Sequence, residues 1–146
     1  MANLFTVYTP FQLFVAQQVV NQEKLQDNIL IVGYIDGNPH FLDIYDMMMI
    51  EEMWREVIVF PELPYWDGYY NRSIKAIKQT YDRFKWFQSI IKDNNVDSLY
   101  MAEMYDPAIQ FLDVLFYHRG IKTYFFEEGG SHYIQRTHRD ESKWLK

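Results

Sequence analysis

The feature that most constrains the fold is a regular alternation between short, mostly apolar runs and longer stretches with helical character. The apolar runs span residues 4–8, 29–34, 57–60, 99–101 and 122–126. The helical stretches between them span residues 10–21, 41–54, 71–95 and 107–120. Strands that are covered on both faces read as continuous apolar runs, and parallel strands need a helix to connect them. The sequence therefore predicts an α/β fold, a Rossmann-like parallel sheet with helices on both faces.

Two of the helical stretches have further residues that are typical of a helix start or of an amphipathic helix. Thr9 is a good N-cap, Pro10 suits the first helical position and Gln12 completes a capping box, so a helix is expected to begin here. This first helix is apolar over much of its length, and we expect it to be largely buried. The longest stretch has the pattern of an amphipathic helix. Its apolar stripe consists of Ile74, Ile77, Tyr81, Phe84 and Ile91.

The composition narrows the classes of function. A chain of 146 residues has the size of one domain, and residues 1–146 show no internal linker or repeat. Its net charge of −6 argues against a nucleic-acid partner, which would require a basic patch. The lack of cysteine excludes disulfides and thiolate metal sites. Neither a secretory signal nor a membrane-spanning run is recognised, so a cytoplasmic protein is expected.

The candidate chemical groups follow the predicted strands. Ligands of open α/β sheets bind beyond the carboxyl ends of the strands. Thr9 and Gln12 follow the first strand, Glu103 follows the fourth, and an acidic turn follows the fifth. The first turn lacks the Gly-x-Gly-x-x-Gly spacing that lets a backbone approach a pyrophosphate, so a dinucleotide cofactor is not expected. The histidines and carboxylates show no metal-ligand spacing, and no metal is expected.

The acidic turn Glu127-Glu128-Gly129-Gly130 is the most distinctive segment. Two adjacent carboxylates at a strand end point to opposite sides, so one can face a cleft while the other supports the turn. A part-buried glutamate beside another carboxylate has its pKa raised toward the working pH, as a general base for a sugar hydroxyl requires. Ser131 and His132 follow closely enough to contact a substrate or to orient the base. The alternative interpretation is a solvated acidic turn.

Structural alternatives also exist for the other segments. Helix capping by itself accounts for Thr9 and Gln12, whereas the functional hypothesis makes them substrate-binding residues at a helix N-terminus. An aromatic loop around Trp66 could stack on a sugar ring or pack against a neighbour.

Two segments in this order resemble the bacterial CMP-sialic-acid-dependent sialyltransferases that decorate lipooligosaccharide or build polysialic acid capsules. The opening strand that runs into Thr9-Pro10-Phe11-Gln12-Leu13 resembles the start of these enzymes. The segment Phe125-Phe126-Glu127-Glu128-Gly129-Gly130-Ser131-His132-Tyr133 is similar to their acidic-acidic-glycine motif. The resemblance implies a GT-B arrangement of two Rossmann-like domains, of which residues 1–146 would form the N-terminal, acceptor-side half.

The resemblance also implies a reaction. The enzyme would transfer sialic acid from CMP-sialic acid to a glycan hydroxyl with inversion, without a metal or any further cofactor. Glu128 would be the general base, and Glu127, Gly129 and His132 would support it. Thr9, Gln12, Glu103 and Ser131 would contact substrate. A lipid-linked acceptor would place the protein at the inner face of the membrane.

The sequence departs from this family in one respect that bears on the partner. The family's second domain has a His-Pro motif that helps to bind the CMP phosphate, and this sequence contains no His-Pro dipeptide. Most of the nucleotide site is therefore expected in a C-terminal domain or a partner chain. The alternative to a transferase is a non-catalytic α/β module that binds a glycan or a partner.

Overall fold

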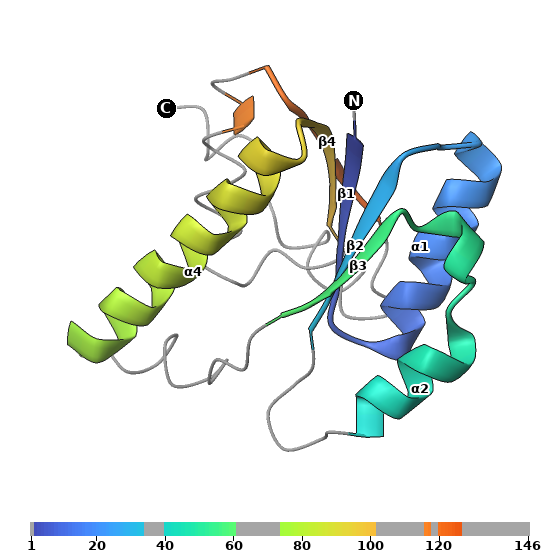
Figure 1. Ribbon diagram of the computed structural model, residues 1–146, viewed down its shortest axis with the longest axis horizontal. Coiled ribbons are helices and arrows are strands. Elements are labelled where there is room, and N and C mark those ends of the chain that lie inside the picture. The colour runs from blue at the N-terminus through green and yellow to red at the C-terminus, as the bar shows by residue number, and fades with distance from the viewer. Residues whose placement is uncertain (1, 34–39, 61–73, 102–115, 118–119, 127–146) are drawn as a thin grey trace, which may run out of the picture.

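The structure is a computed structural model, and it describes residues 2–33, 40–60, 74–101, 116–117 and 120–126. Its centre is a sheet of five parallel strands in the order β3-β2-β1-β4-β5 (Figure 1). The strands are β1 (Ala2–Val7), β2 (Asn28–Val32), β3 (Glu56–Val59), β4 (Val96–Met101) and β5 (Lys122–Phe125). The prediction of a Rossmann-like α/β fold with a parallel sheet is confirmed.

Helices cover both faces of this sheet, as the alternating pattern predicts. The helices α1 (Pro10–Glu23) and α2 (His40–Met48) lie on one face, and α4 (Ile74–Asp93) lies on the other (Figure 1). Successive residues of β1 point alternately to the two sides, so Phe5 and Val7 pack under α1 whereas Leu4 and Tyr8 pack under α4. Two separate hydrophobic cores result, one on each face of the central strands.

The expected helix over residues 41–54 is in fact two pieces. Helix α2 ends at Met48, and a 3-10 turn, η1 (Glu51–Met53), follows it. The side chain of Gln17 on α1 holds the break, because Nε2 donates to the Met48 carbonyl (3.2 Å) and Oε1 accepts from the Ile50 amide (2.8 Å). In a continuous helix the Ile50 amide would donate four residues back along the chain. A tertiary hydrogen bond therefore replaces a helical one.

The packing of α1 differs from the expectation of a largely buried apolar helix. Its buried face includes the polar residues Gln12 and Gln17, while Phe11 and Phe14 are 52% and 48% exposed. Both glutamines make hydrogen bonds, which removes the main cost of burying an amide. The buried side of α1 thus combines the apolar residues Leu13, Ala16 and Val20 with two hydrogen-bonded glutamines.

Only part of the predicted apolar stripe of α4 faces the core. Ile91 is buried and Phe84 packs against the core, but Ile74, Ile77 and Tyr81 are 87%, 67% and 56% exposed. At about 100° per residue, Ile74 and Tyr81 lie more than about 100° around the helix from the buried Phe87, so they do not share its side. The expectation of one continuous stripe is wrong for the first two turns of α4.

The helix expected before β5 lies mostly outside the described residues, but its end is visible. Residues 116–117 are helical, and Phe116 is fully buried. Gly120 has φ +72, and the amides of Gly120 and Ile121 donate back to the carbonyls of Tyr117 and Phe116. This is a glycine C-cap of the Schellman type, so the predicted helix end near Gly120 is confirmed.

Candidate functional site

The order of the strands defines where a ligand site of this fold belongs. From β1 the chain moves outward to β2 and β3, and it then crosses back to β4 on the other side of β1. The carboxyl ends of β1 and β4 therefore border a topological switch point, where ligands of open α/β sheets bind. The candidate site residues that the sequence predicts lie in the segments that follow β1, β4 and β5.

Thr9 and Gln12 lie directly after β1, at the start of α1. The Gln12 amide donates to Thr9 Oγ1 (3.2 Å), and Thr9 has the extended backbone (φ −137°, ψ 154°) of an N-cap. Gln12 Oε1 accepts a hydrogen bond from the backbone amide of Tyr8 (2.6 Å), one residue before the amide that a standard capping box would use. The predicted cap is therefore confirmed, with a shifted partner for Gln12.

This geometry bears on the predicted substrate-binding role of the two residues. Gln12 is fully buried, whereas Thr9 is half-buried. Pro10 has no amide hydrogen, and the Gln12 amide already donates to Thr9. The described contacts of Thr9 and Gln12 hold the helix start in place, and a role for them toward a substrate stays a prediction.

Beside Thr9, the ring of Tyr8 lies directly against the backbone of Gly33, the residue that follows β2. A Cβ atom at Gly33 would stand 2.5 Å from Tyr8 Cδ1, so only glycine fits in this position. The Gly33 amide donates to the Val7 carbonyl (2.7 Å), and the buried Tyr45 hydroxyl donates to the Gly33 carbonyl (2.9 Å). Burial raises the pKa of Tyr45, which keeps this hydroxyl protonated as a donor. These contacts fix the carboxyl edge between β1 and β2.

The other predicted site residues lie outside the described residues. They are Glu103, Glu127, Glu128, Gly129, Ser131 and His132. The structure does describe the strands that lead to them. The amide of Phe126 donates to the Met101 carbonyl (3.0 Å), so the chain after β5 is still aligned with the end of β4 at the residue before Glu127. Strands β1, β4 and β5 are consecutive neighbours, which brings the segments after Val7, Met101 and Phe125 to one stretch of the edge.

An aromatic ladder crosses these three strands on the α1 face of the sheet. The ring of Tyr100 stacks on Phe5 (4.4 Å between centroids) and on Tyr124 (4.7 Å). Burial, together with the neighbouring Tyr124, raises the pKa of Tyr100. Phe5 is fully buried, whereas Tyr124 on the outer strand is 42% exposed. The ladder packs side chains of the three strands that lead to the candidate site against one another, and sequence reasoning did not single it out.

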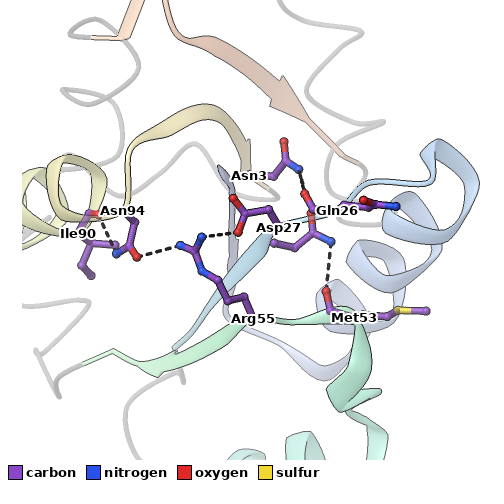
Figure 2. A network of polar contacts seen from close by, with 8 residues as sticks. Asn3, Gln26, Asp27, Met53, Arg55, Ile90 and Asn94 are labelled. Carbon is purple, nitrogen blue, oxygen red and sulfur yellow. Dashed lines mark hydrogen bonds and ion pairs between the residues drawn. The ribbon is translucent and has the colours of Figure 1, made fainter. Parts of the chain in front are cut away.

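Sequence reasoning also missed a polar network at the opposite, amino edge of the sheet (Figure 2). Arg55, just before β3, contacts Asp27 through Nη1 and donates from Nη2 to Asn94 Oδ1 (2.9 Å). The side chain of Asn28 donates to the carbonyls of Leu25 (3.2 Å) and Met53 (3.1 Å). In the sequence, this network is indicated only by an asparagine or aspartate just before an apolar run.

This network also includes Asn3, whose side-chain amide donates to the Gln26 carbonyl (2.9 Å) and to Asn28 Oδ1 (3.0 Å). Its members join the starts of β1, β2 and β3 to the end of α4. Because it lies at the amino edge and its groups bind one another, we interpret it as structural rather than as a ligand site.

Within the described ranges, no group of three or more His, Asp or Glu side chains could hold a metal ion. In the same part of the chain, none of the helices has both the length and the apolar character to cross a membrane. The sequence matches no protein-family model and no curated protein. The fold and the switch point therefore define the class, a Rossmann-like α/β protein.

Proposed function

We propose that this chain is the acceptor-side half of a bacterial GT-B sialyltransferase that acts on a cell-surface glycan such as lipooligosaccharide or a capsule. The observation that carries the proposal is the sheet order β1-β4-β5. The two segments that resemble the family, at Thr9 and at Glu127, are far apart in the sequence but follow strands only two positions apart. That separation is about 10 Å at the strand ends, two strand spacings of the sheet.

In the proposed reaction, the Glu128 carboxylate removes the proton from an acceptor hydroxyl as that oxygen attacks the anomeric carbon of sialic acid. The new C–O bond forms on the face opposite the departing phosphate of CMP, and CMP leaves with the bonding electron pair. Glu127, Gly129 and His132 would position the base, and Thr9, Gln12, Glu103 and Ser131 would contact substrate. The CMP group itself would be held mainly by a second domain or a partner chain.

The proposal places the protein in the cytoplasm, at the inner face of the membrane, where lipid-linked acceptors are exposed. It requires no metal and no cofactor beyond the donor substrate.

The decisive experiment measures the transfer of sialic acid from CMP-sialic acid to a lactose-terminated acceptor by the product of the complete reading frame. Glu128→Gln keeps the shape of the side chain but removes the base, and we expect kcat to fall about 10²–10⁴-fold. The binding of CMP, measured by calorimetry, should stay unchanged. Glu127→Gln is the matched control, because it changes the neighbouring carboxylate and should cost much less.

Two results would count against the proposal. Undiminished turnover by Glu128→Gln would place the base elsewhere. Glycan binding without turnover, by the wild-type protein and the variant alike, would favour a non-catalytic binding module.

A further inference from the structure

One side of α4 is an exposed face that is apolar in the first turns and carries lysines along the length of the helix. Ile74, Ile77 and Tyr81 are the exposed apolar members of this face. Its exposed lysines are Lys78, Lys85 and Lys92. With about 100° between successive residues, all six fall on one side of the helix: Ile74, Ile77, Lys78, Tyr81, Lys85 and Lys92. We call these six residues the outer face of α4.

The charges of α4 contrast with those of the whole chain. Among the described exposed side chains of α4, three lysines (Lys78, Lys85 and Lys92) outnumber two acidic residues (Asp82 and Asp93), whereas the chain has a net charge of −6. Lys85 Nζ lies 5.5 Å from the centre of the Tyr81 ring, which shows that the lysines and the apolar side chains form one surface. A helix with apolar side chains between lysines on its exposed side is typical of a surface that binds anionic lipid.

The position of this face in the fold supports a membrane rather than a further layer of the core. The opposite side of α4 is already packed, because Phe87, Ile90 and Ile91 lie in the core against the sheet. In a parallel sheet the crossover helix runs back against the strands, so the N-terminal end of α4 lies toward the carboxyl edge. In Figure 1 this yellow-green end extends outward, on the far side of the strands from α1 and α2.

We propose that the outer face of α4 docks the protein onto an anionic bilayer surface. The lysines would meet lipid phosphates while Ile74, Ile77 and Tyr81 enter the headgroup region. A symmetric contact between two copies is less favourable, because it would bring the same three lysines against one another. The further idea that docking presents a lipid-linked acceptor to the carboxyl edge rests on the proposed function, whereas the docking itself does not.

Co-sedimentation with vesicles tests the proposal on the whole chain. The probe is large vesicles of phosphatidylcholine with about 30% phosphatidylglycerol, compared with vesicles of phosphatidylcholine only, a composition chosen to give a strongly negative surface. We expect binding only to the anionic vesicles, and weaker binding at high salt. Lys78→Glu with Lys85→Glu should reduce partitioning by more than about 25-fold, since each lysine near such a surface accounts for about fivefold, or 1 kcal/mol.

A second pair of variants separates the apolar contribution from the charge. Ile77→Ser with Tyr81→Ser should reduce partitioning about tenfold or more by removing the buried apolar area. Lys122→Glu on β5 and Val59→Ser on β3 are matched controls, because both residues are exposed but lie outside α4. Circular dichroism and the unfolding midpoint would verify that each variant is folded.

The proposal is overturned if the protein ignores anionic vesicles, or if the α4 variants bind them as well as the wild type does. It is also overturned if the same variants abolish a dimer seen by sedimentation velocity while lipid binding is nil, which would identify a second copy as the occupant. Because vesicle binding requires no transferase activity, a failure of the Glu128 experiment would leave this result unaffected.

Discussion

The two edges of the sheet share backbone hydrogen bonds between neighbouring segments and differ in the side chains that join their elements. At the amino edge, side chains link separate elements, as Asn28 does between Leu25 and Met53 and as Arg55 does between Asp27 and Asn94. At the described part of the carboxyl edge, backbone amides pair with backbone carbonyls, and the side-chain contacts include the α1 cap and the Tyr45 hydroxyl. Side-chain hydrogen bonds between distant residues therefore add to the backbone pairing at the amino edge, where they join α4 and the starts of three strands.

The substitution Asn28→Asp is the most direct test of whether side-chain hydrogen bonds stabilise the amino edge. Asn28 is 2% exposed and donates two hydrogen bonds that a carboxylate cannot make. We expect a loss of about 3 kcal/mol in the free energy of unfolding, because two carbonyls lose their donor and a charge is buried. Urea denaturation measures it. Asn21→Asp, at an exposed position of α1, is the control and should change stability by less than about 0.5 kcal/mol.

If Asn28→Asp costs no more than its control, the amino edge is not held by these bonds. If the variant is destabilised but hydrogen exchange at the Gly33 and Phe126 amides is unchanged where it is folded, the two edges are stabilised independently.

The next largest effect should come from Gln17, which holds the break between α2 and η1. Gln17→Ala leaves the Met48 carbonyl and the Ile50 amide without their side-chain partner, and we expect a loss of about 2 kcal/mol. Hydrogen exchange at the Ile50 amide should accelerate in parallel. Gln18→Ala is the control, because Gln18 is the next residue on the same helix and is exposed. Equal effects of the two variants would show that the Gln17 bonds do not determine where α2 ends.

Gln17 also illustrates which parts of the fold could be predicted from the sequence. The strands were recognisable because a run such as Ile29-Leu30-Ile31-Val32 has apolar side chains for both faces of a sheet. The start of α1 was recognisable because its cap uses residues close in sequence, Thr9 and Gln12. Features that depend on contacts within a few residues, or on burial of a whole segment, could thus be read directly.

The rest depends on contacts between distant residues. The burial of Gln17 requires acceptors and donors more than thirty residues away, at Met48 and Ile50. The exposure of Ile74 and Tyr81 depends on where α4 crosses the sheet, which a periodic pattern does not specify. For the candidate site, the strands that precede Glu103 and Glu127 are confirmed, whereas the roles of the residues that follow stay predictions.

At the carboxyl edge, Tyr45→Phe should have a smaller effect of about 1 kcal/mol, the value of one hydrogen bond to the Gly33 carbonyl. The variant should also alter the pH dependence of stability. Burial raises the pKa of Tyr45 above its ordinary value of 10.0, so the folded protein keeps a proton that the unfolded chain releases. The stability from this group is therefore complete below pH 10.0 and is lost as the pH rises above it.

Denaturation of the wild type and of Tyr45→Phe at pH 8 and at about pH 11 measures this difference, with the higher pH chosen to lie above the ordinary tyrosine pKa. The wild type should lose more stability between these two pH values than the variant does. Parallel losses in the two proteins would mean that Tyr45 ionises in the folded state as readily as it does in the unfolded chain.

The smallest effect should come from Arg55, although it is the most visible member of the amino-edge network in Figure 2. Its side chain is 42% exposed and that of Asp27 is 35% exposed, so solvent screens their ion pair. We expect Arg55→Gln to cost about 0.5 kcal/mol, and the cost should shrink further in 1 M salt because exposed charges are screened. Arg55→Lys keeps the charge but loses the forked contact with Asp27 and Asn94, and it separates charge from geometry. A cost above about 2 kcal/mol that salt does not reduce would show that the ion pair and the buried Asn28 bonds stabilise the amino edge as one cooperative unit.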